Sequence, residues 1–219
     1  MRKELEVISR ATLFGGIKGE ELEKLLVCMD STRKKYRRQE MILSEEEIPD
    51  RIGIVLEGSV QVVQDDVFGN RNIVEKLEKG GLFGAAFACA GVRKSPVSVI
   101  AEKDCEICWM HIGKVLSVCP AACPCHQQML RNLVTILAGK NVAFSEKITC
   151  LSRRSTREKL LSYLSETAKK EKKRHFVIPF NRQELADYLC VDRSAMSAEL
   201  SKLRRDGVLD YRKSEFWLI

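Results

Sequence analysis

Residues 180–208 of the 219-residue chain read FNRQELADYLCVDRSAMSAELSKLRRDGV. Asn181 followed three residues later by Glu184 has the spacing of a capping box, which begins a helix. After a short turn, Asp192 can cap a second helix, and Gly207 is suited to end it. Two short helices joined by a tight turn predict a helix-turn-helix.

The second of these helices, residues 193–206, has two faces when it is read at about 100° per residue. Met196, Leu200 and Leu203 fall on one side, which we expect to be buried. The opposite side carries small side chains, which let a helix enter the major groove of DNA, and basic residues near its end. The alternative is a packing helix with a solvated outer face. The candidate DNA-binding residues are Arg182, Gln183, Arg193, Ser194, Ser197, Ala198, Ser201, Lys202 and Arg205.

Two apolar runs around Lys213 and Ser214 predict a hairpin after this helix, which makes the motif winged. We expect Phe216 and Trp217 to pack in its core. Residues 150–219 hold 16 basic and 10 acidic side chains, whereas the remaining 149 residues hold 21 and 20. A basic module on a nearly neutral body favours a polyanionic partner, either nucleic acid or an anionic membrane surface.

Short apolar runs separated by glycines and turn residues characterise residues 41–111. Many short strands at such close spacing predict a β-sandwich or barrel. Cys105 and Cys108 are three residues apart in one of these runs, so we expect them to face opposite sides of the sheet. The runs are residues 52–58, 60–63, 73–77, 97–101 and 105–110, with a hairpin signal at 65–70.

Residues 126–151 predict one long helix with a heptad-like stripe. Two interpretations of this helix are open. It lies across the β-domain, or it pairs with a second copy of the chain, in which case the polar Asn141 would set the register. We favour the dimer helix. The stripe is Leu130, Leu133, Leu137, Asn141, Phe144, Ile148 and Leu151.

The chain has nine cysteines, an odd number, and its charged start lacks the apolar segment of a secretory signal. We therefore expect cytosolic thiols and no disulfide framework. Cys119, Cys123, Cys125 and His126 lie within eight residues just before the long helix. These four ligands could hold zinc, copper(I) or an iron–sulfur cluster. The same cysteines could instead sense redox state, or pack in a turn as small apolar residues.

The order of these parts resembles the cyclic-AMP receptor/FNR (Crp/Fnr) family of bacterial transcription regulators. The motifs that carry the resemblance are LEGSV at 56–60, GGLFG at 80–84 and the stretch 180–208. The resemblance covers nearly the whole chain. It implies an α+β fold with an N-terminal cyclic-nucleotide-binding-like β-roll (jelly roll) and a homodimer on a palindromic operator. An effector in the β-roll would reorient the DNA modules through the long helix.

The resemblance is incomplete at the effector pocket. The ribose-binding carboxylate is missing at Ala85, and Lys94 replaces a planar, bidentate arginine with a point charge. These departures disfavour a cyclic nucleotide as the effector. The N-terminal region has only Cys28, so the iron–sulfur arrangement of FNR-type members is absent, and Ala198 stands where relatives often place an arginine. The candidate pocket residues are Gly84, Ala85, Ala86, Lys94 and Ser95.

We therefore expect a β-roll sensor domain (1–125), a dimerisation helix (126–151) and a winged helix-turn-helix DNA-binding domain (152–219). The predicted function is a cytoplasmic, homodimeric, sequence-specific transcription regulator, with RNA polymerase as a candidate partner. Its effector would be sensed in the β-roll or the cysteine-rich segment. The alternative is a small-molecule or metal/redox-sensing module that acts through a protein partner. No apolar run predicts a membrane span, and no nucleophile elbow, phosphate-binding glycine loop or carboxylate pair indicates an enzyme.

Overall fold

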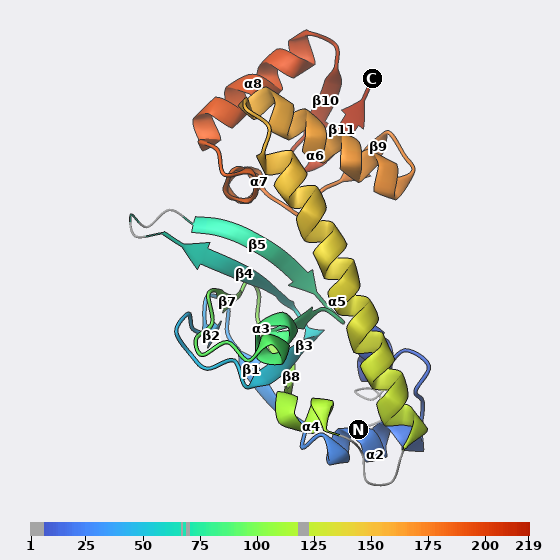
Figure 1. The fold of residues 1–219 in the computed structure, drawn as a ribbon. Helices are drawn as coiled ribbons and strands as arrows, with labels where there is room; N and C mark the ends of the chain where they lie inside the picture. Colours follow the sequence, from blue (N-terminus) through green and yellow to red (C-terminus); the bar gives the residue numbers. More distant parts are fainter. Residues whose placement is uncertain (1–6, 67, 69–70, 118–122) are drawn as a thin grey trace. The chain divides into compact units, whose positions relative to one another are not determined.

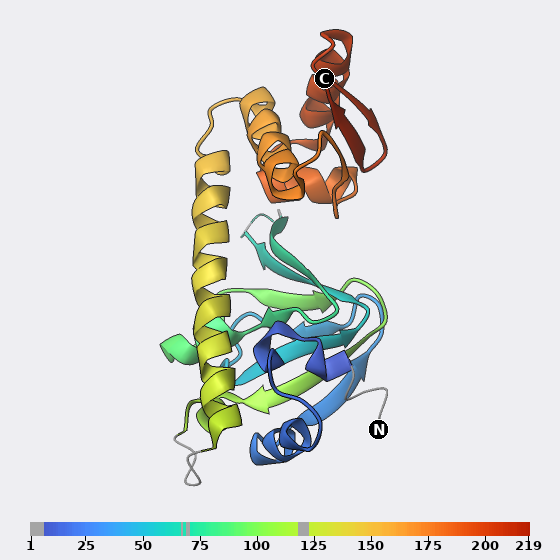
Figure 2. The ribbon, with the colours of Figure 1, turned by 90° about the vertical axis from the view of Figure 1, so that its right-hand side faces the viewer.

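The computed structural model describes residues 7–66, 68, 71–117 and 123–219. The chain divides into two compact units, residues 1–69 with 74–141 and residues 70–73 with 142–219. Figures 1 and 2 show the elements of each unit. Within the described ranges, no helix is both long and apolar enough to cross a lipid bilayer.

The first unit is built on two four-stranded sheets, with strand orders β1-β8-β3-β6 and β2-β7-β4-β5. The central pairs, β3 with β8 and β4 with β7, are antiparallel. This arrangement confirms the predicted β-sandwich and gives the jelly roll. The strands are β1 (Thr32–Tyr36), β2 (Met41–Leu43), β3 (Arg51–Glu57), β4 (Ser59–Asp65), β5 (Arg71–Glu78), β6 (Leu82–Phe83), β7 (Ser98–Ala101) and β8 (Cys105–His111).

Alternation along the central strands separates two apolar cores. On β3, Ile54 faces a core shared with helices, whereas Val55 faces the interior between the two sheets. On β8, Cys108 belongs to the first core and Cys105 to the second. Successive side chains of a strand point to opposite faces, and the prediction that these two cysteines face opposite sides of the sheet is confirmed.

Helices cover the outer face of the β1-β8-β3-β6 sheet. They are η1 (Thr12–Phe14), α2 (Glu20–Cys28), α3 (Ala85–Ala90), α4 (Ile112–Leu116) and α5 (Pro124–Leu151). Met129 and Leu133 bring the first half of α5 into the helix-side core. Asn132 on the same helix donates hydrogen bonds to the carbonyl oxygens of Leu13 (3.0 Å) and Gly15 (2.8 Å). The long helix predicted at 126–151 is therefore confirmed, and its first half does lie on the β-domain.

The second unit contains α6 (Thr156–Glu171), β9 (His175–Val177), α7 (Arg182–Leu189), α8 (Arg193–Arg205), β10 (Leu209–Arg212) and β11 (Glu215–Leu218). The strands form one antiparallel sheet in the order β10-β11-β9. Phe216 is fully buried beneath it, and Trp217 on the other face stacks on His175 with ring centroids 4.7 Å apart. The expected core role is thus confirmed for Phe216, whereas Trp217 is half-buried.

Candidate nucleic-acid interface and effector domain

The two helices of the predicted helix-turn-helix begin at side-chain caps. The Asn181 side chain accepts from the Glu184 amide, and the Glu184 carboxylate accepts from the Asn181 amide, so the capping box is present. Asp192 accepts from the Ala195 amide at 2.8 Å and begins α8. Gly207 follows α8 with φ +70, a left-handed conformation that glycine adopts without strain. Each of these signals was predicted from sequence.

The inner and outer faces of α8 also agree with the prediction. Met196, Leu200 and Leu203 are fully buried. Because α8 packs on α6 and α7 through this face, its other side is left uncovered within the second unit. The exposed residues of α8 are Arg193, Ser194, Ala195, Ala198, Ser201, Lys202, Arg204 and Arg205.

The serine hydroxyls of α8 bond back to the helix itself. Ser197 donates to the Arg193 carbonyl oxygen (2.8 Å), and Ser201 donates to the Ser197 carbonyl oxygen (3.0 Å). Ser194 donates to the Asp192 carboxylate. Each hydroxyl proton is thereby committed, and the oxygen retains a lone pair that can accept from a base amino group such as cytosine N4 or adenine N6.

The cations around α8 differ in their pairing. Lys202 pairs with Glu199 at 2.7 Å, and Arg204 Nε lies 2.7 Å from Asp210 Oδ1. Among the described residues, the Arg193 and Arg205 guanidinium groups have no ion-pair partner, so they are available to an anion.

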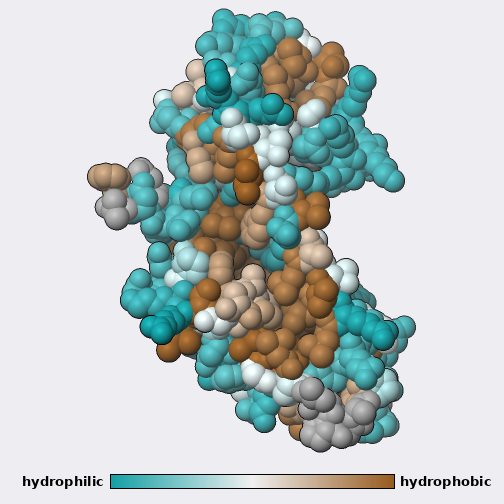
Figure 3. Space-filling view, in the orientation of Figure 1, coloured by the Kyte–Doolittle hydropathy of each residue, from teal (hydrophilic) through white to brown (hydrophobic). Residues whose placement is uncertain are grey.

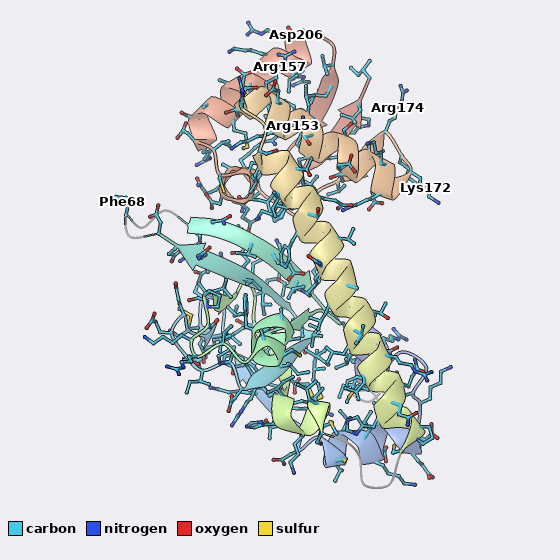
Figure 4. The ribbon with its side chains drawn as sticks, in the orientation of Figure 1. Phe68, Arg153, Arg157, Lys172, Arg174 and Asp206 are labelled. Carbon is cyan, nitrogen blue, oxygen red and sulfur yellow. The ribbon has the colours of Figure 1, made fainter. Side chains whose placement is uncertain are left out.

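A further ion pair ties the end of α8 to the start of α6. Arg157 on α6 donates to the Asp206 carboxylate at 2.9 Å, and Figure 4 shows the two residues close together. Arg153 and Arg154 just before α6 are exposed. Lys172 and Arg174 extend from the turn between α6 and β9 in the same view.

The two predicted residues of α7 are placed differently from each other. Gln183 is exposed and donates to Asp187 Oδ1 at 2.8 Å. The Arg182 guanidinium instead turns toward the wing, with its Cζ atom 4.6 Å from the centre of the Tyr211 ring. Sequence reasoning missed two exposed cations at the wing tip, Arg212 and Lys213, although the hairpin around residues 213–214 was itself predicted.

Two of the five predicted effector-pocket residues, Lys94 and Ser95, are already engaged by the protein. Ser95 is buried, and its hydroxyl donates to the Val97 carbonyl oxygen at 2.6 Å. Lys94 forms an ion pair with Glu46. A phosphate at this point would have to displace the exposed Glu46 carboxylate from Lys94 and would find the Ser95 hydroxyl already bonded. The other three residues lie at the start of α3, where Gly84 has φ +77, Ala85 is buried and Ala86 is exposed.

Aromatic side chains fill the interior of the β-roll. Phe83 and Trp109 meet edge to face with ring centroids 5.3 Å apart, and Trp109 Nε1 donates to the Tyr36 hydroxyl at 3.1 Å. A Cβ on Gly53 would lie 2.2 Å from the Phe83 ring, so glycine is required beside it. The interior between the sheets is therefore a packed core at this point.

The cysteine-rich segment is only partly described. Cys119 lies outside the described residues, and within those ranges no three His, Cys, Asp or Glu side chains are arranged to hold a metal ion. His126 is buried, with Nε2 2.9 Å from the Val115 carbonyl oxygen, so Nε2 carries the proton. Burial, followed by the neighbouring Cys123 and Glu21, raises the pKa of the Cys125 thiol to about 11. That thiol stays protonated at neutral pH.

From Val134 onward, α5 presents some apolar side chains to solvent. Val134, Phe144 and Ile148 are 66%, 37% and 68% exposed, and Figure 3 shows apolar surface over the middle of α5. Leu133, which the sequence analysis placed in this stripe, is only 2% exposed and belongs to the core of its own chain. With Val134 in its place the spacing is strictly four and three. We define the α5 seam as Leu130, Val134, Leu137, Asn141, Phe144, Ile148 and Leu151.

Two protein families match this sequence. The family described as "Cyclic nucleotide-binding domain" matches residues 33–120, and the "Crp-like helix-turn-helix domain" matches residues 158–219. The chain belongs to the Crp/Fnr family. The protein has the Crp/Fnr order of parts, which is an effector-type β-roll, a long helix and a helix-turn-helix. It is a transcription regulator with a DNA-binding domain.

Solved structures share this Crp/Fnr fold. FixK2 from Bradyrhizobium japonicum is 22% identical, with a TM-score of 0.65 over 86% of this chain and 92% of that one. The c-di-GMP-responsive regulator CLP of Xanthomonas campestris is 16% identical, with a TM-score of 0.72 over 90% and 97%. The catabolite activator protein of Thermus thermophilus is 21% identical, with a TM-score of 0.55 over 95% and 93%. A search of curated protein sequences gives no match.

Proposed function

We propose that the protein is a homodimeric regulator that binds a palindromic operator through α8. The observation that carries this proposal is the outer face of α8, which is exposed, has small side chains and has a cation without an ion-pair partner at each end, Arg193 and Arg205, among the described residues. A major groove admits such a helix, and two copies related by a two-fold axis would read a palindrome.

Within this proposal, bases are read near the start of α8 by Arg193, Ser194 and Ser197. An arginine can donate two hydrogen bonds to guanine, and the serine oxygens can accept from amino groups. The rest of the interface is formed by Gln183, Ala198, Ser201, Lys202 and Arg205. We add the wing cations Arg212 and Lys213 for the phosphate backbone. Arg182 is left out of the direct contacts because its guanidinium faces the wing.

We propose that two copies pair through the α5 seam. Its four–three spacing is that of a two-stranded coiled coil, and Val134, Phe144 and Ile148 within it are exposed in the described chain. Asn141 lies in the middle of the seam, where a polar residue fixes register and the number of strands at a cost in stability.

The proposed effector is not a cyclic nucleotide. Glu46 already neutralises Lys94, the Ser95 hydroxyl is committed, and Ala85 has no carboxylate for a ribose. We retain the β-roll and the segment around Cys123 and Cys125 as the two candidate sensing sites. The protein would act in the cytoplasm, where it meets its operator and, at a promoter, RNA polymerase.

Selection from a random-sequence DNA library by the purified full-length protein tests this proposal. We expect enrichment of a palindrome, and a variant with Arg193, Ser194 and Ser197 all changed to alanine should not enrich it. The selection should be run on protein purified with and without oxygen, and with a small-molecule cell extract added. A library that stays unenriched under all these conditions would overturn the proposal.

A further inference from the structure

Arg182, the first residue of α7, is packed against the wing. Its Cζ atom lies 4.6 Å from the centre of the Tyr211 ring and 5.2 Å from that of Phe216. Tyr211 is on β10 and Phe216 on β11, and the two rings lie 6.1 Å apart. One guanidinium therefore contacts both strands of the wing hairpin.

This guanidinium has unusual surroundings for an arginine on a surface helix. Its Nη2 atom is buried and, within the described residues, has no hydrogen-bond partner. Burial lowers the pKa of Arg182, and the nearby Tyr211 opposes that shift. Burying an unpaired cation is costly, and the faces of two aromatic rings offset part of that cost. Because Nη2 is buried, a phosphate could reach it only if the surrounding groups moved away.

Tyr211 also contacts α8, the second helix of the motif. The Arg204 Cζ atom lies 5.6 Å from the centre of the Tyr211 ring, and Arg204 Nε bonds to the adjacent Asp210 at 2.7 Å. The Ser201 hydroxyl lies 3.5 Å from the Tyr211 hydroxyl. The wing strand β10 therefore contacts α7 through Arg182 and contacts α8 through Arg204 and Ser201.

We propose that Arg182 is a positioning residue, which fixes the wing beside α8 by stacking on Tyr211 and Phe216. This inference rests on the proposed DNA-binding function, because the wing matters only where it meets DNA. It assigns Arg182 a role other than the direct DNA contact predicted from sequence. The exposed cations at the wing tip, Arg212 and Lys213, would reach the DNA backbone at a point that Arg182 sets.

The first test needs no DNA. In the full-length protein, amide hydrogen exchange in residues 209–218 should be about 3- to 30-fold faster in Arg182→Met and in Arg182→Lys, which keeps the charge but loses the planar face. Tyr211→Leu, which removes the same contact from the other side, should do likewise. Arg193→Met, which removes an exposed cation without ring contacts, should leave this exchange unchanged. Wild-type exchange in all three contact variants would overturn the proposal.

The second test uses a duplex recovered from the library by the wild-type protein. Arg182→Met should weaken its binding about 3- to 30-fold without changing the dependence of affinity on salt, and Arg182→Lys should not restore it. A lost phosphate contact in each copy of the dimer would instead lower the slope of log K against log salt by about 1.8, and lysine would restore most of it. That result would overturn the positioning role. If the wild-type protein recovers no duplex, the proposed function fails and hydrogen exchange alone decides this inference.

Discussion

Arg193 is the cation of α8 that both stands at the start of the helix and lacks an ion-pair partner among the described residues. It lies next to the Asp192 cap. We predict that Arg193→Ala lowers specific affinity by about 1–3 kcal/mol and relaxes the preference at one operator position. Binding-site selection together with affinity measurements checks this result.

The matched control is Arg174→Ala, which removes another exposed arginine, from the turn before β9. It should leave the base preference unchanged. If Arg193→Ala also leaves the preference unchanged, Arg193 contacts phosphate and reads no base.

The Cys125 thiol gives a second prediction for a single residue. With a pKa of about 11, only about one thiol in ten thousand is ionised at pH 7. Alkylation followed by mass spectrometry should therefore label the exposed Cys28 and Cys190 first. The rate at Cys125 should rise steadily as the pH approaches 11, because the thiolate is the nucleophile. Rapid labelling of Cys125 at neutral pH would show the stabilised thiolate that the redox-sensing hypothesis requires.

At the level of elements, α5 uses adjacent residues for two purposes. Leu133 packs into the core of its own chain, and Val134 is exposed in the α5 seam. We predict that Val134→Lys or Ile148→Lys weakens dimerisation by about 3 kcal/mol or more, because each change removes an apolar side chain from both copies. Sedimentation velocity over a range of concentrations measures this loss.

Leu133→Ala is the control for that experiment. It should cost about 2–5 kcal/mol of unfolding free energy by leaving a cavity, and the dimer contacts themselves should remain. A Val134→Lys protein that stays dimeric at low concentration would place the dimer interface elsewhere.

Elements with strong local signals were predicted correctly from the sequence. Elements whose structure depends on packing against distant residues were missed. Helix α8 has a side-chain cap, a periodic apolar face and a terminal glycine, and it was predicted within one residue. Strand β1, with the sequence TRKKY, was missed because it is an edge strand with four exposed residues and no apolar alternation. Helix α3 has only six residues and follows Gly84, which provides no side-chain cap. Its sequence therefore has neither a helical apolar period nor a capping signal.

The same limit explains the error in the α5 stripe. Leu133 and Val134 are both apolar, and sequence spacing alone allowed either one. Only the packing of α5 on the β-domain distinguishes the buried residue from the exposed one. The candidate DNA-binding face was predictable because its signals are local, whereas the contact of Arg182 with Tyr211 joins residues 29 positions apart.

For the whole molecule, the uneven charge predicts that the affinity for DNA depends strongly on salt. The excess of basic residues lies in residues 150–219, and each copy in a dimer would contribute its own phosphate contacts. If the dimer makes 6–10 such contacts, affinity should fall by about 10³–10⁵ between about 50 and 200 mM salt. Fluorescence anisotropy on the selected duplex measures the slope. A flat dependence would show that phosphate contacts contribute little.

The engaged residues of the β-roll give a prediction about its ligand. Cyclic AMP at millimolar concentration should change neither the melting temperature nor the affinity for the selected duplex, because Lys94 is paired and Ser95 is committed. A ligand at a hundred times its dissociation constant would stabilise the protein by about 2.7 kcal/mol, which calorimetry detects readily. A clear rise in melting temperature would restore the cyclic nucleotide as an effector.

The neighbouring placement of Leu133 and Val134 has a consequence for how α5 tolerates changes in length. Successive residues of a helix are separated by about 100° around its axis, so deleting one residue after position 134 would rotate Asn141, Phe144 and Ile148 away from the line that begins at Leu130. Removing seven residues would instead shorten the helix by about 10 Å and nearly preserve the angular phase. Natural relatives that differ in length here should therefore differ by whole heptads.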